Sequence, residues 1–320
     1  MSIGVLALVG LSPERVAALT AAGYAVREGK KYPERIDAIR EAGDSVRAVL
    51  TNGRGGLTGD EMQLLPKLEL VCTVGAGYEA VDLETARRRG IAVANCPDTN
   101  ASAVADSAMM LLMAATRHLR QADRHVHGGG WQDQWRVDTP TISGKRLGIL
   151  GMGTIGSKIA HRGARGFEME VGYHNRKAVS GSSYRYFDSL IELARWADFL
   201  VCAAPGGAGT RHLVNADVLT ALGPKGYLVN VGRGTVVDTA ALIDALRSKR
   251  VAGAGLDVLE GEPAIPPILP ELLQFDSVVV TPHCSGRAPE ARTAATALVL
   301  ANLNAFFAGK PLASPVSFKT

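Results

Sequence analysis

This chain has few cysteines, and none of them has the spacing of a metal-binding or redox motif. No C-x-x-C pair occurs, and most of the cysteines lie in or beside apolar runs. A secreted framework held by disulfides is therefore not expected, and buried reduced thiols in a cytoplasmic protein are the simplest interpretation. The four residues are Cys72, Cys96, Cys202 and Cys284.

Long apolar runs are also missing. No stretch approaches the roughly 18 uninterrupted apolar residues of a membrane helix. The apolar start at 3–9 has no basic region before it and leads into Ser12-Pro13-Glu14, which is a helix-start signal. We therefore predict a first strand rather than a signal peptide, and no membrane partner.

Basic residues are scattered rather than clustered. The net charge is +4, and the densest basic run, Arg87-Arg88-Arg89, stands just before Gly90. Cations at a helix C-terminus complement the helix dipole, so this run does not indicate nucleic-acid binding. With 47% hydrophobic and 21% charged residues over 320 positions, the chain has ordinary globular composition and the length of two domains.

Alternating strand and helix signals predict a small doubly wound unit at the start of the chain. Strand-like apolar runs lie at 3–9, 46–50, 68–74 and 91–94. Between them, a helix opens at Ser12 and stops at Gly23, and Thr58-Gly59-Asp60-Glu61 forms a capping box. This alternation is typical of a parallel sheet covered by helices.

A second alternating series, from residue 146 to about residue 282, predicts a larger domain of the same class. Its six strands are expected at 147–150, 169–173, 199–203, 227–231, 255–258 and 278–280. A closing helix at 289–307 is predicted to return to the first unit. We therefore expect an α/β fold of two doubly wound parallel-sheet domains, one discontinuous at 1–98 and 289–320 and the other at 99–288.

The segment between the two series predicts one long helix over 101–127, ending at Gly128-Gly129-Gly130. His118, His125 and His127 raise the question of a metal site. Residues two positions apart do not share a helix face, and a credible site needs several convergent ligands. Polar residues of a helix end are the better interpretation, and no metal is expected.

Gly151-Met152-Gly153-Thr154-Ile155-Gly156 follows a predicted strand and opens a predicted helix, which is the context of a dinucleotide-binding turn. The first glycine allows a tight turn, the second lets the backbone approach the pyrophosphate, and the third lets helix pack on strand. Amides at the helix N-terminus would receive the negative charge. A simple tight turn is the alternative. The predicted cofactor residues here are Gly151, Gly153, Thr154, Ile155 and Gly156.

The end of the next strand bears on the choice of cofactor. Chains that bind NAD usually place an acid about 20 residues past the glycine motif. Here the strand ends Tyr173-His174-Asn175-Arg176-Lys177, without an acid. Arg176, backed by Asn175 and Lys177, could hold a 2′-phosphate through charge-assisted hydrogen bonds. NADP(H) is therefore the expected cofactor and NAD(H) the alternative, while a solvated basic loop would carry no preference.

Three short motifs place an arginine, a glutamate and a histidine after apolar runs. They are Asn230-Val231-Gly232-Arg233-Gly234, the run 256–263 that contains Glu262, and Thr281-Pro282-His283. Ligands of open parallel sheets collect beyond the carboxyl ends of the strands, so the three side chains are expected to face one crevice. An arginine for a carboxylate, a histidine for a proton and a glutamate to tune it suit the reduction of a 2-oxo acid.

Together these motifs resemble the D-isomer-specific 2-hydroxyacid dehydrogenase family, and within it the glyoxylate/hydroxypyruvate reductases. GMGTIG, VGRG, GLDVLEGEP and TPH occur in the family's order, and the resemblance covers nearly the whole chain. It implies a Rossmann coenzyme domain inserted in a smaller, flavodoxin-like substrate-binding domain. It also implies an NADPH-dependent reduction of small 2-oxo acids to D-2-hydroxy acids.

The resemblance also implies residue roles. Arg233 would bind the substrate carboxylate and keto oxygen, His283 would be the acid/base, and Glu262 its partner. Arg54, inside a glycine-rich turn, is a further candidate anion contact, with a solvated turn arginine as the alternative. Implied cofactor contacts are Pro205, Thr210, Val231 and Asp257, the last at the nicotinamide carboxamide. Implied substrate contacts are the backbone amides of Val74, Gly75, Ala76 and Gly77, a nest of N–H groups around an anion.

Relatives within the family set the alternatives. Formate dehydrogenases carry glutamine where Glu262 stands, and many phosphoglycerate dehydrogenases have an extra regulatory domain, so neither activity is expected. A larger substrate of the phenylpyruvate or 2-ketogluconate type stays open. A non-catalytic, dinucleotide-sensing corepressor is not excluded, because such proteins keep the arginine, glutamate and histidine. It is a remote alternative, since the sequence shows no long disordered tail and no obvious segment for docking a partner.

A homodimer is expected, because family members pair through their coenzyme domains. The segment Gly130-Trp131-Gln132-Asp133-Gln134-Trp135 is predicted to cross between subunits. Aromatic residues are common at the centres of such interfaces. A local cover over the chain's own core is the alternative for this segment.

Overall fold

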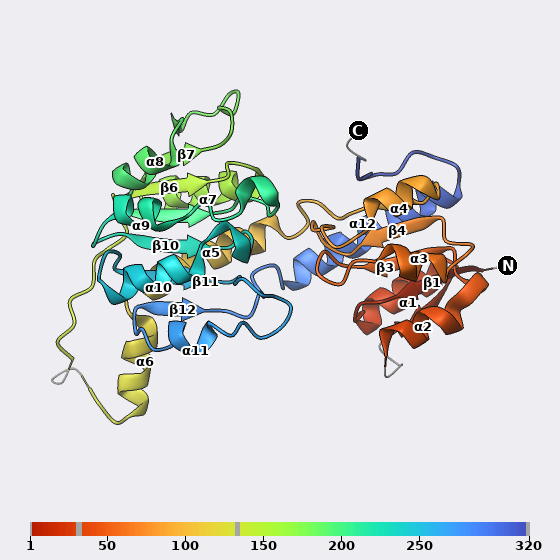
Figure 1. Ribbon diagram of the computed structural model, residues 1–320, viewed down its shortest axis with the longest axis horizontal. Helices are drawn as coiled ribbons and strands as arrows, with labels where there is room; N and C mark the ends of the chain where they lie inside the picture. Colours follow the sequence, from red (N-terminus) through yellow and green to blue (C-terminus); the bar gives the residue numbers. More distant parts are fainter. Residues whose placement is uncertain (1, 30–33, 132–134, 318–320) are drawn as a thin grey trace. The chain divides into compact units, whose positions relative to one another are not determined.

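The computed structural model describes residues 2–29, 34–131 and 135–317. The chain divides into two compact units, Met1–Asn100 with Ala288–Thr320, and Ala101–Arg287. Each unit is a parallel sheet with helices packed against it (Figure 1), so the predicted α/β class with two parallel-sheet domains is confirmed. Among the described residues, no helix has both the length and the apolar character needed to cross a bilayer.

The first unit holds a five-stranded sheet in the order β2-β1-β3-β4-β5, and every neighbouring pair is parallel. Its strands are β1 (Ile3–Ala7), β2 (Tyr24–Glu28), β3 (Ala48–Thr51), β4 (Leu70–Thr73) and β5 (Ala92–Ala94). Its helices are α1 (Pro13–Ala21), α2 (Arg35–Ala42), α3 (Gly59–Gln63), α4 (Leu83–Arg88) and α12 (Pro289–Phe307).

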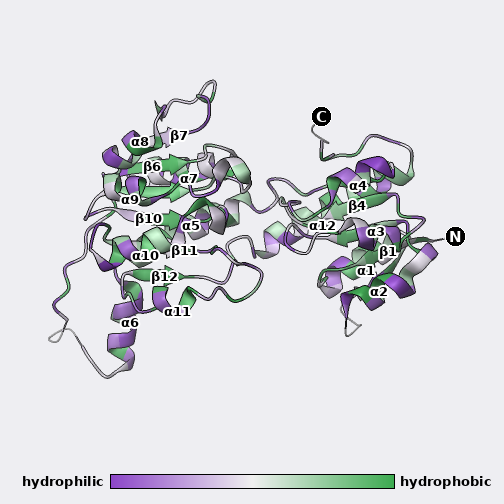
Figure 2. Cartoon of the chain, viewed as in Figure 1, coloured by the Kyte–Doolittle hydropathy of each residue, from purple (hydrophilic) through white to green (hydrophobic). Residues whose placement is uncertain are grey.

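Successive strand residues of this sheet enter two different cores. Val49 packs with α2, α3 and α4, whereas its neighbour Leu50 packs with α1 and α12. The inner strands β1, β3 and β4 therefore read as continuous apolar runs, drawn in green in Figure 2, because both faces of the sheet are covered. Two predicted helix starts are confirmed: Ser12 accepts from the Arg15 amide, and Thr58 forms a capping box with Glu61.

Two elements of this unit are missing from the sequence-based prediction. β2 alternates buried and exposed residues and ends in Arg27 and Glu28, so it shows no apolar run. It is one of the two edge strands of the sheet, and its other residues are only partly covered. α2 has no side-chain N-cap and begins after residues outside the described ranges.

The second unit holds a seven-stranded parallel sheet in the order β12-β11-β10-β9-β6-β7-β8. Its strands are β6 (Arg146–Leu150), β7 (Glu170–His174), β8 (Arg185–Phe187), β9 (Phe199–Cys202), β10 (Tyr227–Asn230), β11 (Gly253–Leu256) and β12 (Val278–Val280). Its helices are α5 (Ala101–Thr116), α6 (Leu119–His127), α7 (Thr154–Gly166), α8 (Leu190–Trp196), α9 (Ala216–Leu222), α10 (Thr239–Arg247) and α11 (Leu269–Leu272).

The larger sheet is also covered on both faces. One core joins its strands to α8, α9 and α10, and the other joins them to α5 and α7. Leu228 belongs to the first core and its neighbour Val229 to the second. This double burial explains why the strands could be recognised as short apolar runs in the sequence.

Two predictions for this unit need correction. The sheet has seven strands rather than six, because β8, a three-residue edge strand, adds to the predicted set. The long helix over 101–127 is in fact two helices, α5 and α6, separated at His118, whose φ of 50° is left-handed. No glycine or proline marks this break in the sequence.

Candidate active site

The predicted arginine, glutamate and histidine follow three neighbouring strands. Arg233 lies just past the end of β10, Glu262 in the loop after β11, and His283 just past β12. These strands are adjacent and parallel, so their carboxyl ends lie at the same edge of the sheet. The tertiary structure thus brings together loops that are distant in the sequence.

A buried asparagine shapes the turn that carries Arg233. Asn230, the last residue of β10, is 1% exposed. Its side-chain oxygen accepts from the Gly232 amide at 3.1 Å, and its side-chain nitrogen donates to the Arg233 carbonyl at 3.0 Å. The Asn230 side chain therefore stabilises the turn, and this role is not predicted from the sequence.

The glycines on either side of Arg233 are needed because other backbone approaches closely. A Cβ on Gly232 would lie 2.4 Å from the Ala204 carbonyl oxygen, and one on Gly234 would lie 2.0 Å from the Leu259 carbonyl carbon. Gly206 packs on the Arg233 side chain, where a Cβ would lie 3.0 Å from its Cγ. The turn is therefore wedged between the loops that follow β9 and β11.

Glu262 and His283 form a hydrogen-bonded pair. Glu262 Oε2 pairs with His283 Nδ1, and Glu262 Oε1 accepts from the Leu259 amide at 2.8 Å. Their side chains are 20% and 27% exposed, so the pair is largely shielded from water. A carboxylate on Nδ1 leaves Nε2 as the ring nitrogen that can exchange a proton with a substrate.

Asp257 anchors the loop that carries His283. Its carboxylate accepts from the Thr281 hydroxyl at 2.6 Å, the Cys284 amide at 2.9 Å and the Ser285 amide at 3.1 Å. The residue is 2% exposed. The His283 amide also donates to the Asp257 carbonyl at 2.8 Å. Asp257 therefore positions His283 through its loop, which the sequence did not predict.

A second histidine–carboxylate pair lies beside the first. His212 Nε2 and Glu260 Oε1 are 2.7 Å apart, and Glu260 Oε2 accepts from the Thr239 amide at 3.2 Å. Burial opposes the charged carboxylate, yet the hydrogen bonds from His212 and Thr239 outweigh burial and lower the pKa of Glu260. This pair is not predicted from the sequence, although Glu260 stands two positions before Glu262.

The glycine-rich turn between β6 and α7 has the geometry that a dinucleotide needs. Gly151 has a φ of 99°, and its Cβ would lie 2.7 Å from the Ala204 amide nitrogen. A Cβ on Gly156 would lie 2.1 Å from the Gly151 carbonyl oxygen, whereas one on Gly153 would meet no atom within 4 Å. The first and third glycines are thus required for packing, and the second leaves open space where a pyrophosphate can approach.

The N-cap residue of helix α7 is Gly153, which has no side chain that could cap the helix. The first-turn amides of Thr154 and Ile155 therefore have no capping partner within the helix and point toward its N-terminal end. Such amides are suited to a phosphate. The Asn175 side chain accepts from the Met152 amide at 2.7 Å and so ties the end of β7 to this turn. The fit of these residues to a dinucleotide is therefore good.

The other predicted cofactor residues lie on loops of the same sheet edge. Arg176 and Lys177 follow β7 and are exposed. Thr210 Oγ1 donates to the Pro205 carbonyl at 2.8 Å, which closes the loop after β9. The Val231 amide donates to the Cys202 carbonyl at 3.0 Å.

The predicted substrate residues of the first unit lie on two loops that pack together. A Cβ on Gly53 would lie 2.7 Å from the Gly77 carbonyl carbon, so the turn that carries Arg54 contacts the loop 74–77. The carbonyls of Gly75 and Ala76 accept from the Cys96 amide and the Asn95 side chain at 2.9 and 2.7 Å. These bonds hold the loop. The Val74 amide donates to the Thr51 carbonyl at 2.9 Å, so its predicted role as an anion donor needs correction, and the remaining candidate donors are the amides of Gly75, Ala76 and Gly77.

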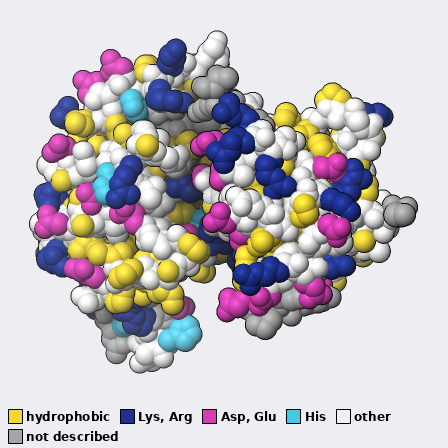
Figure 3. Space-filling model, turned by 45° about the vertical axis from the view of Figure 1, so that its right-hand side comes forward, with side chains coloured by type: hydrophobic (Ala, Val, Ile, Leu, Met, Phe, Trp, Pro, Cys, Tyr) yellow, Lys and Arg dark blue, Asp and Glu magenta, His cyan; other side chains and the backbone are white. Residues whose placement is uncertain are grey.

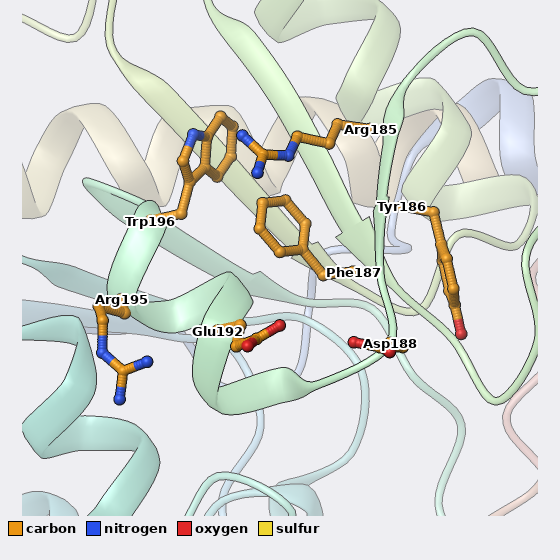
Figure 4. A pocket seen from close by; sticks show the side chains of 7 residues that line it. All are labelled: Arg185, Tyr186, Phe187, Asp188, Glu192, Arg195 and Trp196. Carbon is orange, nitrogen blue, oxygen red and sulfur yellow. The ribbon is translucent and has the colours of Figure 1, made fainter.

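A surface hollow of about 580 Å³ in the second unit is lined by residues of β8 and α8 (Figure 4). The Arg185 guanidinium stacks on the rings of Phe187 and Trp196, at 4.5 and 5.8 Å from their centroids. The Arg185 side chain therefore already covers the aromatic rings that line this hollow. On the surface shown in Figure 3, Lys and Arg side chains are dispersed rather than gathered into one basic patch.

Comparison with known proteins decides the family. Residues 109–285 match the family described as D-isomer specific 2-hydroxyacid dehydrogenase, NAD binding domain. The chain belongs to the D-isomer-specific 2-hydroxyacid dehydrogenase family. The resemblance inferred from its motifs is thus confirmed, and the chain is an oxidoreductase that uses a nicotinamide dinucleotide.

Relatives of this dehydrogenase act on several 2-oxo acids. It is 39% identical to a hydroxyphenylpyruvate reductase from Plectranthus scutellarioides, over 89% of this chain and 90% of that protein. It is equally identical, over the same shares, to a glyoxylate/hydroxypyruvate reductase from Arabidopsis thaliana. An NADPH-dependent glyoxylate/hydroxypyruvate reductase from Sinorhizobium meliloti, solved with NADP and malonate, is 36% identical with a TM-score of 0.88, covering 99% and 97% of the two chains.

Proposed function

We propose that this dehydrogenase is an NADPH-dependent reductase of small 2-oxo acids, such as glyoxylate or hydroxypyruvate, and forms D-2-hydroxy acids. The observation that carries the proposal is the Glu262–His283 pair at the same sheet edge as the Arg233 turn. A carboxylate hydrogen-bonded to one ring nitrogen of a histidine favours the imidazolium that can protonate a forming alkoxide.

In this proposal the side chains divide the work at the carbonyl group. The Arg233 guanidinium binds the substrate carboxylate and orients the keto oxygen. His283 donates its Nε2 proton to that oxygen as negative charge develops on it, and Glu262 stabilises the imidazolium. The bound nicotinamide supplies the hydride that adds to the carbonyl carbon. In the first unit, the amides of Gly75, Ala76 and Gly77, together with Arg54, are proposed to bind an anionic group of the substrate.

The NADPH preference in this proposal rests on Arg176. The residues after β7 include no acid that could bind the ribose hydroxyls of NAD, and Arg176 and Lys177 are exposed there. A guanidinium recognises a phosphate through paired charge-assisted hydrogen bonds. The similarity to an NADPH-dependent reductase solved with NADP supports the same choice.

A larger aromatic 2-oxo acid is the second candidate substrate. A hydroxyphenylpyruvate reductase is among the similar proteins, as is a 2-ketogluconate reductase for a larger sugar acid. The two candidates make the same use of Arg233, Glu262 and His283 and differ in the group attached to the keto carbon.

A panel of 2-oxo acids assayed with NADPH and with NADH tests the proposal. We expect turnover of glyoxylate and hydroxypyruvate, with NADPH the better donor. Higher kcat/KM for aromatic 2-oxo acids would replace the small substrates by the second candidate. Binding of dinucleotide without turnover of any 2-oxo acid would contradict the enzymatic proposal.

We also propose that the chain forms a homodimer through α5, α6 and the segment that follows. Large apolar side chains are exposed there: Met110, Leu119, Val126 and Trp131 at 46%, 58%, 50% and 68%. Exposed apolar side chains gathered on one pair of helices are typical of a protein interface. Trp135 contacts the His125 ring of its own chain at 5.5 Å, and residues 132–134 lie outside the described residues.

A further inference from the structure

Two histidine–carboxylate pairs hold the segment that follows β11. Glu262 pairs with His283, and two positions earlier Glu260 pairs with His212. Gly261 between the two acids has a φ of 92°, so the backbone turns sharply there. His212 and His283 both have left-handed backbone, with φ of 53° and 52°, which residues other than glycine adopt only when their surroundings hold them.

The Glu260–His212 pair connects the loops of three neighbouring strands. His212 lies in the segment after β9, and its amide donates to the Thr235 carbonyl at 2.8 Å in the segment after β10. Its ring reaches Glu260 in the segment after β11. Glu260 in turn accepts from the Thr239 amide at the start of α10. The segments joined in this way also carry Thr210, Arg233 and Glu262.

The charged groups around this pair balance one another. Glu260 faces His212 and, at 3.6 Å, the Arg211 guanidinium. The other ring nitrogen of His212 lies 3.9 Å from the Asp238 carboxylate. The side chains of His212 and Glu260 are only 32% and 25% exposed, so solvent screens their interaction incompletely.

We propose that His212 and Glu260 are positioning residues that keep the Glu262 carboxylate within hydrogen-bonding distance of the His283 ring. This inference rests on the proposed function of Glu262 and His283. Neither His212 nor Glu260 needs to touch substrate or cofactor for this role. Loss of the His212–Glu260 pair removes one anchor of the segment 258–262. The hydrogen bond between the Glu262 carboxylate and the His283 ring is then formed less often.

The test compares Glu260→Gln and His212→Gln with the unmutated enzyme, and repeats Glu260→Gln in a Glu262→Gln background. We measure the pH profile of kcat for 2-oxo acid reduction and the Kd of NADPH. In the unmutated background, each variant should lower kcat about three- to tenfold, the scale of coupling within a contact network. Each should also move the alkaline limb to lower pH. For Glu260→Gln, the Kd of NADPH should stay within about twofold, because Glu260 lies in neither the glycine turn nor the loop that carries Thr210.

The Glu262→Gln background separates positioning from general damage. If Glu260 acts through Glu262, Glu260→Gln causes no further shift of the alkaline limb there. A shift that persists in this background, or none in the unmutated background, overturns the inference. Matched controls are His161→Gln, an exposed histidine of α7, and Asp44→Asn, from an exposed ion pair with Lys67. Both should leave the profile unchanged.

A second readout keeps this test independent of turnover. The ring resonance of His283, assigned by its loss in His283→Gln, is followed against pH by NMR in the unmutated protein and in Glu260→Gln. We expect the resonance to titrate at lower pH in the variant. If no 2-oxo acid is reduced, the proposed function fails, and this titration still decides the inference. An unchanged titration overturns it.

Discussion

Glu262 and His283 are separated by 21 positions in the sequence and are hydrogen-bonded in the folded chain. The carboxylate stabilises the charged imidazolium, so the acid form of His283 should persist to higher pH than it would without Glu262. Glu262→Gln keeps a group of similar size and removes the charge. We expect the alkaline limb of kcat for reduction to move toward acid.

This shift is measured with a deuterated cofactor, so that hydride transfer is known to limit turnover. His283→Ala is the companion variant and should abolish most activity at every pH while NADPH binding is kept. An unchanged alkaline limb in Glu262→Gln would show that Glu262 is not the electrostatic partner of His283.

Asp257 should contribute to stability as well as to activity. Its buried carboxylate satisfies two amides and a hydroxyl of the loop 281–285. An unsatisfied buried donor costs about 1–3 kcal/mol. We therefore expect Asp257→Ala to lower the free energy of unfolding by about 3 kcal/mol and Asp257→Asn by less, because Asn keeps one acceptor oxygen. Urea unfolding measures both, with Asp44→Asn as an exposed control that should change little.

The choice of cofactor should depend on Arg176. Removal of its guanidinium takes away the proposed partner of the 2′-phosphate, and a hydrogen bond to a charged group is worth about 1.5–3 kcal/mol. In Arg176→Ala we expect kcat/KM for NADPH to fall at least about tenfold, with little change for NADH. Arg195→Ala, an exposed arginine of α8, is the matched control. Equal or better efficiency with NADH in the unmutated enzyme would contradict the proposal.

The proposed dimer can be tested on α6. Leu119 and Val126 are 58% and 50% exposed, and burying a charge in an apolar interface is strongly unfavourable. Leu119→Asp with Val126→Asp should convert the dimer to monomer in sedimentation at micromolar concentration. Ile191→Asp on α8, where the side chain is 38% exposed, should leave the dimer intact. A stable monomer of the unmutated protein would remove the proposal.

The Arg146–Asp198 pair predicts a pH-dependent contribution to stability. Burial would raise the pKa of Asp198, but hydrogen bonds from the Arg146 side chain and amide outweigh burial and lower it. A depressed pKa contributes stability above the unfolded value of about 3.9, and this stability is lost as pH falls through the folded value. With allowance for partial exposure, Asp198→Asn should cost about 1 kcal/mol near neutral pH.

Urea unfolding at about pH 7, pH 5 and pH 3 measures this difference between Asp198→Asn and the unmutated protein. It should be constant at the two higher values and shrink at the lowest, which lies below the unfolded value of about 3.9, where the carboxyl of the unfolded chain is protonated. A difference that stays the same at every pH would show that the charge of Asp198 does not matter.

Much of this protein could be predicted from short stretches of sequence. The strands are apolar on both faces, so they stand out as short runs, and the glycine turn and the VGRG, GEP and TPH motifs each follow such a run. Helix starts at Ser12 and Thr58 were equally local, because a cap is made within one turn. These features do not depend on the rest of the fold, and together they predicted both sheets and the family.

The tertiary structure decided what depends on which strands are neighbours. The His212–Glu260 pair spans 48 positions and exists because β9, β10 and β11 lie side by side. The hydrogen bonds from the His283 loop to the Asp257 carboxylate likewise form only because β11 lies beside β12. The edge strands β2 and β8 and the break at His118 carry no apolar run or glycine that could reveal them. Long-range hydrogen bonds and half-exposed edges leave little local pattern, because their partners come from elsewhere in the fold.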